Sequence, residues 1–545
     1  MIAMRADELN SVTQSLDQLF SPWNKSDAPG LVVGVALGGA PIYRKGFGLA
    51  SLEAEAINTP KTRMRIASTT KQFTAFLALL LAEDGRLDLD APIRQYLPEL
   101  GGPAGDPSVR LLLQHRGGSR CSVDLSYLAN GMRPPPVGSS LSYQVRQRER
   151  NFLPGEAMIY NNGGYHLLSI AIERAGAAPF EVQLSNRIFG PLGMLDTTCV
   201  ASDYLITRGI ATLHEKDAQG AWRRGLFPSK EIRGDGAIVS TIDDMLLWMD
   251  LLRRRDKLGS PRTWEALTEK PRFPDGSEGH YALGLIVDTY RGLPRLHHAG
   301  AVHGGASQMI TFPEHGLDVI ILANGAPGAE PWTLADGVAD IALENQLGER
   351  RRFVDATQHA DLLGDWFTEQ GSVPYKLLDE GGLLKVAVSG NTSGIPLEAV
   401  GGGVAVARAR GLGPVFVNIR DSSAENSLEI RFGGRSLVYK RGTAGDQDCL
   451  AFQRMSLGTY YSHDADCTAK IALRDGALAL ELKGVTGSVQ SALIRPLSQR
   501  LGILSPATAA DTLNGAIELS PGAAMVPSFA LNTMRTRALV FERVN

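Results

Sequence analysis

The stretch that decides the fold reads Ile66-Ala67-Ser68-Thr69-Thr70-Lys71 and runs into the apolar segment 73–82. Ser68 and Lys71 are three residues apart, a spacing that places both side chains on one face of a helix. Because the residues after Lys71 are nearly all apolar or small, we expect this helix to be buried. Burial lowers the pKa of a lysine, so that its amine can take a proton from a serine hydroxyl. The pattern predicts Ser68 as a nucleophile activated by Lys71; the common alternative is a helix-capping serine followed by a surface lysine.

Length and composition favour a multidomain globular protein. The 545 residues exceed what one core accommodates, and 43% hydrophobic and 21% charged residues are ordinary for this class. The net charge of −3 weighs against nucleic acid or a polybasic membrane surface as partner. The N-terminal segment lacks a signal-peptide pattern, and no apolar run reaches the ~18 residues that span a bilayer. We therefore expect a cytoplasmic protein without membrane contact.

The four cysteines are far apart and form no CxxC pair; they are Cys121, Cys199, Cys449 and Cys467. This spacing predicts free thiols in a reducing compartment and no metal site. A local bridge between the last two is the weaker alternative. We expect no metal or cofactor.

The first 348 residues have an α+β pattern. Apolar segments 31–37 and 41–48 flank Gly38-Gly39 and predict a hairpin. Strand-like runs between 281 and 325 predict a meander that completes the same antiparallel sheet. We therefore assign residues 1–348 to one domain.

The rest of the chain is rich in short alternating segments and contains a weak repeat. Residues 362–367 recur as 456–461, and 437–441 recur as 539–543. Such marks in the same order predict two copies of a small antiparallel barrel. We place the two barrels at 352–445 and 446–545. Ordinary closing-strand patterns of β domains are the alternative explanation.

Two further motifs carry candidate chemistry. In Tyr160-Asn161-Asn162, a tyrosine beside a lysine can exchange protons, and an asparagine amide can hold both the lysine and a substrate carbonyl. In His298-Ala299-Gly300-Ala301, a glycine on an edge strand lets a substrate approach the backbone. The N–H groups of Ser68 and Ala301 could then hold an oxyanion. Taken alone, each motif also fits a structural role, in a turn or in the core.

Together, the three motifs resemble the serine penicillin-recognising enzymes in order and spacing. Those enzymes have SxxK, then Tyr-x-Asn in the class C β-lactamases and related carboxypeptidases, and then Lys-Thr-Gly. The flanking segments 64–71, 152–155 and 236–241 match as well, so the resemblance covers about residues 10–345. It implies a β-lactamase/penicillin-binding-type catalytic domain of mixed α/β class, followed here by two antiparallel β-barrels.

The third motif has histidine where those relatives have lysine. A neutral His298 would bind a substrate carboxylate weakly, and a His-x-Gly motif with two C-terminal barrels resembles the bacterial D-aminopeptidases. That resemblance implies Ser68 as nucleophile and Lys71 with Tyr160 as the proton-transfer pair.

The same resemblance implies five substrate-binding residues, namely Asn162, His298, Gly300, Ala301 and Asp511. Asp511 lies on a loop, 500–516, that would reach the active site from the last barrel and bind the free amine of the substrate. A homodimer is also expected. His115-Arg116-Gly117-Gly118 replaces the His-Thr-Ser-Gly of many relatives, so this wall of the pocket should differ.

The predicted activity is therefore the hydrolysis of N-terminal D-residues from short peptides and amides through an acyl-enzyme. An esterase, a D-Ala-D-Ala carboxypeptidase or a β-lactamase on the same fold is the first alternative. A non-catalytic sensor that keeps the penicillin-binding fold is the second.

Overall fold

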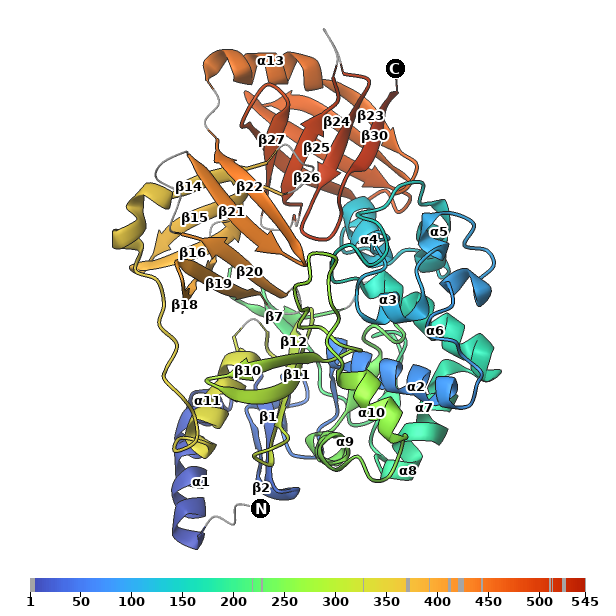
Figure 1. Ribbon diagram of the computed structural model, residues 1–545, viewed down its shortest axis with the longest axis vertical. Helices are drawn as coiled ribbons and strands as arrows, with labels where there is room; N and C mark the ends of the chain where they lie inside the picture. Colours follow the sequence, from blue (N-terminus) through green and yellow to red (C-terminus); the bar gives the residue numbers. More distant parts are fainter. Residues whose placement is uncertain are drawn as a thin grey trace.

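A computed structural model describes residues 5–544, apart from 218, 227–228, 327, 369–372, 392, 410–412, 420–425, 443–444, 509–510, 512 and 522–525. Figure 1 shows three parts in chain order: a mixed α/β part from blue to yellow, an orange antiparallel sheet and a red barrel. The predicted fold class is confirmed. The exact domain boundaries at 348, 352 and 445 stay predictions.

The first part is built on a six-stranded antiparallel sheet in the order β10-β11-β12-β13-β1-β2. Its strands are β1 (Leu31–Leu37), β2 (Ala40–Phe47), β10 (Ile286–Tyr290), β11 (Leu293–Val302), β12 (Gly305–Phe312) and β13 (Leu317–Ala323). The predicted hairpin and meander are confirmed, because both turn glycines have a positive φ and β13 pairs with β1.

Helices cover both faces of this sheet, which explains why β1 is apolar on both sides. On one face lie α1 (Ala6–Phe20) and α11 (Pro331–Ala342), and on the other lie α2 (Lys71–Glu83) and α9 (Ile242–Arg254). Thr241 caps helix α9, because its hydroxyl accepts a hydrogen bond from the Asp244 N–H at 3.2 Å.

A group of helices lies beside α2 (Figure 1). These helices are α3 (Val109–Leu113), α4 (Ser122–Asn130), α5 (Ser139–Arg146), α6 (Asn162–Gly176), α7 (Phe180–Leu184), α8 (Gly190–Leu192) and α10 (Pro261–Thr268). Short strands join them to the rest, namely β3 (Leu49–Ser51), β4 (Ala56–Ile57), β5 (Met64–Arg65), β6 (Thr198–Cys199), β7 (His214–Lys216), β8 (Trp222–Arg224) and β9 (Ile238–Ser240).

The second part is a nine-stranded antiparallel sheet that curls around its own core but stays open in the described residues. Its strands are β14 (Gly364–Phe367), β15 (Tyr375–Glu380), β16 (Leu383–Val388), β17 (Ile395–Pro396), β18 (Glu398–Gly401), β19 (Val404–Ala409), β20 (Gly413–Asn418), β21 (Ser427–Phe432) and β22 (Arg435–Arg441). The first of the two predicted barrels is therefore nearly closed.

The third part is a closed eight-stranded barrel next to α13 (Asp446–Ser456). Its strands are β23 (Gly458–Ser462), β24 (Cys467–Arg474), β25 (Ala477–Gly484), β26 (Val489–Pro496), β27 (Leu501–Pro506), β28 (Gly515–Leu519), β29 (Ser528–Asn532) and β30 (Leu539–Val544). The barrel core continues into Leu125, Leu128 and Tyr143 of α4 and α5. This shared core fixes the barrel against α4 and α5.

The repeat in the sequence corresponds to equivalent strands. The first and last strands of each copy pair with one another, β14 with β22 in the open sheet and β23 with β30 in the barrel. The structure thus explains why 362–367 resembles 456–461 and why 437–441 resembles 539–543.

Three further expectations concern the cysteines, membrane spans and metal sites. All four cysteines are free thiols. Within the described residues, no helix is long and apolar enough to cross a membrane. In the same residues, no group of three or more His, Cys, Asp or Glu side chains is placed to hold a metal ion.

Candidate active site

Ser68 lies on a short 3-10 turn, Ala67–Thr70, that runs directly into α2. Ala67 has a φ of +49°, a left-handed conformation that costs energy in a residue with a side chain. The turn is held from the sheet, because the Ser307 hydroxyl donates to the Ile66 carbonyl at 2.7 Å. The backbone is therefore fixed in a sharp bend that presents Ser68 at the end of a buried helix.

Lys71 is fully buried, so the alternative of a surface lysine is excluded. Its Nζ donates to Ser68 Oγ at 3.2 Å, to Asn162 Oδ1 at 2.8 Å and to the Asp235 carbonyl at 2.7 Å. Burial lowers the pKa of Lys71 to about 7, with Asp235 opposing this shift and the charge of Arg535 adding to it. The amine is thus neutral in a large fraction of molecules at neutral pH, as a proton acceptor beside Ser68 must be.

Asn162 reaches Lys71 because its neighbour caps the helix. The Asn161 side chain accepts from the Gly164 N–H at 2.9 Å and donates to the Ser119 carbonyl at 2.8 Å. Asn162 therefore begins α6 with its amide oxygen toward the lysine. Gly163 and Gly164 lie in the first helical turn, so the alternative of a left-handed glycine turn does not apply.

Tyr160 closes the other side of the lysine, with its ring centroid 4.8 Å from Lys71 Nζ. Its hydroxyl makes no hydrogen bond of standard geometry among the described residues, although Ser68 is near enough to influence it. Burial raises the pKa of Tyr160, while Ser68 and Arg535 act in the opposite direction. Tyr160 is therefore protonated at neutral pH, and Lys71 is the group able to accept a proton.

An aromatic cluster that the sequence did not reveal supports Tyr160 from behind. The His115 ring lies 4.1 Å from the Tyr160 ring and 4.5 Å from the Tyr281 ring. His115 Nδ1 accepts from the Asn161 N–H at 3.0 Å, and burial lowers its pKa well below the ordinary value. Of His115 and Tyr281, only His115 left a signal in the sequence, because it begins the segment that departs from the related enzymes.

His298 belongs to this supporting cluster. It is fully buried, with Nδ1 2.6 Å from the Ala299 carbonyl and Nε2 2.9 Å from the Tyr281 hydroxyl. Burial, with the charge of Lys71, lowers the pKa of His298 to about 3. The residue is not among those that line the pocket; its ring packs against Tyr160 and Tyr281, whereas the sequence predicted it on the substrate side of the strand.

Gly300 and Ala301 do line the pocket, on the part of β11 that extends beyond its partner strand β10. The glycine is required for a different reason from the expected one. A Cβ at Gly300 would lie 2.2 Å from the Ile66 carbonyl oxygen and 2.4 Å from Ser307 Oγ. The absence of a side chain therefore lets β11 pack directly on the bend that carries Ser68.

The pocket above Ser68 has a volume of about 390 Å³. Tyr160 and Asn162 line it beside Ser68, residues 299–303 line one edge, and Val123, Asp124 and Tyr127 of α4 line another. Arg535 lines it as well and comes from the C-terminal barrel. The three sequence motifs are thus brought together, and two charged residues join them.

Asp511 lies elsewhere in the barrel. Its carboxylate accepts hydrogen bonds from the N–H groups of Ser491 and Thr508 and from the Thr508 hydroxyl. It is not among the pocket-lining residues, and its neighbours 509, 510 and 512 lie outside the described residues. The barrel loop that reaches the pocket is 533–538, between β29 and β30, and it brings a cation where an acid was expected.

Two side chains of the first part hold this loop in place. The Asn151 amide donates to the Arg535 carbonyl at 2.8 Å and accepts from the Arg537 N–H at 2.7 Å. The buried Arg120 guanidinium donates to the carbonyls of Arg537 and Ala538 at 3.0 and 2.8 Å. The position of Arg535 is therefore built into the interface between the barrel and the helices.

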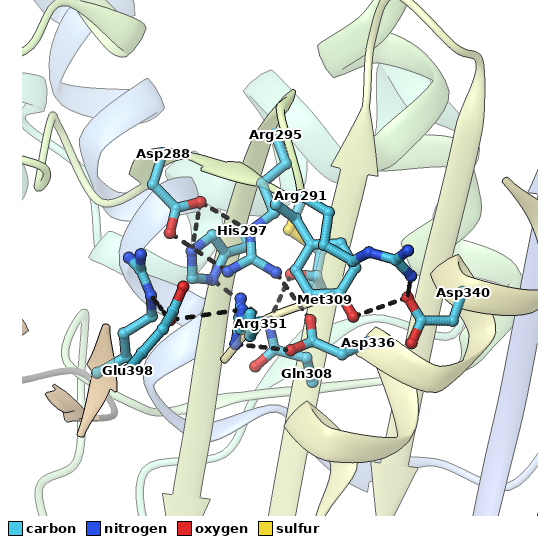
Figure 2. Close-up of polar contacts among 12 residues, drawn as sticks. Asp288, Arg291, Arg295, His297, Gln308, Met309, Asp336, Asp340, Arg351 and Glu398 are labelled. Carbon is cyan, nitrogen blue, oxygen red and sulfur yellow. Dashed lines mark hydrogen bonds and ion pairs between the residues drawn. The ribbon is translucent and has the colours of Figure 1, made fainter. Parts of the chain in front are cut away.

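A second, larger cavity of about 910 Å³ lies between the first part and the nine-stranded sheet and shares Ala299 and Trp332 with the pocket. Figure 2 shows its charged wall, with Arg295 between two carboxylates. Arg295 donates to Asp288 at 2.7 and 3.2 Å and to Asp336 at 2.8 Å. His297 Nε2 lies 3.3 Å from Asp288, on the strand face opposite His298 as the alternation of β11 predicts.

The first part of the chain matches a known family. The family model of the β-lactamases matches residues 16–344. The chain belongs to the β-lactamase family. This confirms the resemblance read from the three motifs and agrees with the positions of Ser68, Lys71 and Tyr160 around one pocket.

Curated relatives of this β-lactamase-family protein include two D-aminopeptidases. The chain is 30% identical over 364 residues to that of Brucella anthropi and 27% identical over 364 residues to that of Brucella ovis. Each match covers 65% of this chain and 66% of the relative, so the chain spans just under two thirds of the length of these relatives.

Solved structures with a similar fold include an octameric penicillin-binding protein homologue from Pyrococcus abyssi. It is 23% identical with a TM-score of 0.55, and the match covers 80% of this chain and 100% of the other. A D-amino acid amidase from Ochrobactrum anthropi SV3 is 25% identical with a TM-score of 0.51, over 63% of this chain and 100% of the other.

Proposed function

We propose that the protein is a serine aminopeptidase that releases N-terminal D-residues from short peptides and amides through an acyl-enzyme. The observation that carries the proposal is a buried Lys71, with a pKa near 7, 3.2 Å from Ser68 Oγ. The names of the D-aminopeptidase and D-amino acid amidase relatives support the choice of substrate.

The first step is attack of Ser68 Oγ on the substrate carbonyl while the neutral amine of Lys71 takes the hydroxyl proton. The N–H groups of Ser68 and Ala301 hold the developing oxyanion. Tyr160, which is protonated at neutral pH, gives its proton to the leaving amine and regains one from the Lys71 ammonium. Water then hydrolyses the ester of Ser68 by the same proton transfers in reverse.

Asp124 is the acidic residue placed to bind the free amine of the substrate. It lines the pocket with Ser68, and its Oδ2 has no hydrogen-bond partner among the described residues. An ammonium group would supply the missing donors. The pocket volume of about 390 Å³ fits a small substrate, which is consistent with short peptides and amides.

A substrate panel tests the proposal. The panel compares D-Ala-p-nitroanilide, its N-acetylated form, nitrocefin and p-nitrophenyl acetate as substrates of the full chain. We expect turnover of the free-amine anilide and little turnover of the other three. Cleavage that survives acetylation of the amine would overturn aminopeptidase specificity, and fast opening of nitrocefin would favour a β-lactamase.

A labelling experiment separates an enzyme from a non-catalytic sensor. The full chain is exposed to an acylating fluorophosphonate and digested, and the modified peptide is identified by mass spectrometry. We expect the label on Ser68. An unlabelled Ser68 in folded protein would favour the sensor.

A further inference from the structure

Arg535 is a charged residue in the pocket whose guanidinium has few hydrogen-bond or ion-pair partners among the described residues. Its guanidinium carries five N–H donors, yet its ion pair among the described residues is a long one, 3.6 Å from Nη1 to Asp124 Oδ1. The guanidinium also stacks 5.2 Å from the centroid of the Tyr160 ring, and the side chain stays 29% exposed. Its remaining donors are therefore available to a molecule in the pocket.

The loop that carries Arg535 is fixed rather than free to turn away. Asn151 binds the Arg535 carbonyl and the Arg537 N–H, and Arg120 binds the carbonyls of Arg537 and Ala538. The guanidinium itself is restrained by Asp124 and by the Tyr160 ring, so less of its ordering cost remains when a substrate binds. Its planar donors match the two oxygens of a carboxylate.

Among the described residues that line the pocket, the strand side has no lysine or arginine. In the related enzymes the third motif has a lysine, but here His298 is buried, neutral and bound to Tyr281. Arg535 reaches the pocket from the side of the barrel instead and lies against the proton-transfer residue Tyr160. A substrate carboxylate near the scissile bond would meet this guanidinium.

We propose that Arg535 binds the free α-carboxylate of the leaving residue, so that the preferred substrates are dipeptides with a D-residue at the N-terminus and both ends free. The inference rests on the proposed aminopeptidase function. Two residues span at most about 7 Å, which agrees with a pocket of about 390 Å³. The ammonium end of the zwitterion pairs with Asp124 and the carboxylate end with Arg535, replacing their long mutual ion pair without burying net charge.

The test compares substrates that differ in that carboxylate alone. Values of kcat/KM are measured for D-Ala-Gly and D-Ala-Gly-amide, with D-Ala-p-nitroanilide as an independent assay of the proposed function. The wild-type protein should prefer the free dipeptide by about tenfold or more, as charge-assisted hydrogen bonds allow. In Arg535→Gln this ratio should fall to near one, and in Arg535→Lys it should be intermediate, because the charge remains without the planar fork.

The matched control is Arg474→Gln, which removes an arginine that is paired with Glu481 on the barrel surface; it should keep the wild-type ratio. Thermal unfolding checks that each variant is folded. A wild-type ratio near one, with D-Ala-p-nitroanilide still cleaved, would overturn the inference and leave the proposed function standing. An equal loss of kcat/KM for both dipeptide substrates in Arg535→Gln would also overturn the inference, because Arg535 would then only neutralise the charge of Asp124. Failure on all three substrates would count against the proposed function itself.

Discussion

Arg295 lies on β11, and Arg535 lines the pocket beside the same strand, but the two arginines differ in burial and in their partners. Arg295 is almost fully buried and bound by two carboxylates at 2.7 to 3.2 Å. Arg535 is partly exposed to the pocket and has one long ion pair. Carboxylates accept three hydrogen bonds from Arg295, so this arginine mainly serves the fold, whereas Arg535 keeps more of its five donors for a ligand in the pocket. The two arginines carry the same charge, and the number of their partners distinguishes them. We call the surroundings of Arg295 the structural region and the pocket of Ser68 and Arg535 the reactive region.

The largest effect should come from Ser68→Ala in the reactive region. Loss of the nucleophile should lower kcat for D-Ala-p-nitroanilide by at least about 10³-fold, as in other serine hydrolases. The thermal unfolding midpoint should change little, because Ser68 Oγ makes a hydrogen bond only with Lys71 among the described contacts. Full activity in this variant would show that Ser68 is not the nucleophile and that its pocket is not the active site.

Gly300→Ala should have the next largest effect, because it disturbs the contact between β11 and the bend of Ser68. The new Cβ would meet the Ile66 carbonyl at 2.2 Å, so one of the two backbones must move. A displacement near 1 Å costs about 10²-fold in rate, measured as kcat/KM. Gly337→Ala is the matched control, because its Cβ would meet Leu19 at an ordinary 3.4 Å. Equal activity of both variants would contradict this role.

The pH dependence of activity tests the role of Lys71 in the reactive region. Below the pKa of Lys71, kcat/KM should change about tenfold per pH unit. Lys71 must be neutral to accept the serine proton, and its pKa is about 7. The value of kcat/KM should therefore fall as the pH drops through 7 and the amine becomes protonated, and rise toward a plateau above it. A profile that is flat from pH 6 to 7.5 would show that another group accepts the proton.

Arg295→Met should change activity least. Its loss leaves the partly exposed Asp288 and Asp336 without their common partner, although His297 and Arg351 stay near them. The free energy of unfolding should therefore drop by about 1–3 kcal/mol. This drop is measured by urea denaturation. Because Arg295 does not line the pocket of Ser68, kcat/KM of the folded fraction should stay within about threefold. A loss of kcat/KM with an unchanged free energy of unfolding would show that Arg295 acts in the reaction and not in the stability of the fold.

The motifs of the first part could be predicted because each depends on short-range spacing. Ser68 and Lys71 share a helical face whatever the rest of the chain does, and Asn161 caps the helix that begins at Asn162. The hairpin turn at Gly38-Gly39 is likewise local. The two barrels were predictable from alternating strands and a repeat, although the openness of the first depends on pairing that the repeat does not encode.

The functions of His298 and of the barrel loop could not be predicted in this way. The motif marks His298, but its neutrality follows from full burial and from Tyr281, which sequence spacing does not fix. The resemblance placed an acid on the 500–516 loop, whereas 533–538 reaches the pocket because Asn151 and Arg120 of the first part bind it.

The sequence by itself determined the family and predicted the trio Ser68, Lys71 and Tyr160, because both depend on residue identity at fixed local spacing. Only the tertiary structure decided the charges of the pocket. The pKa of Lys71 follows from its burial, and Asp124 meets Arg535 only after a barrel packs on α4. Electrostatic interactions depend on distance and burial in space, and residues far apart in the chain acquire both only on folding.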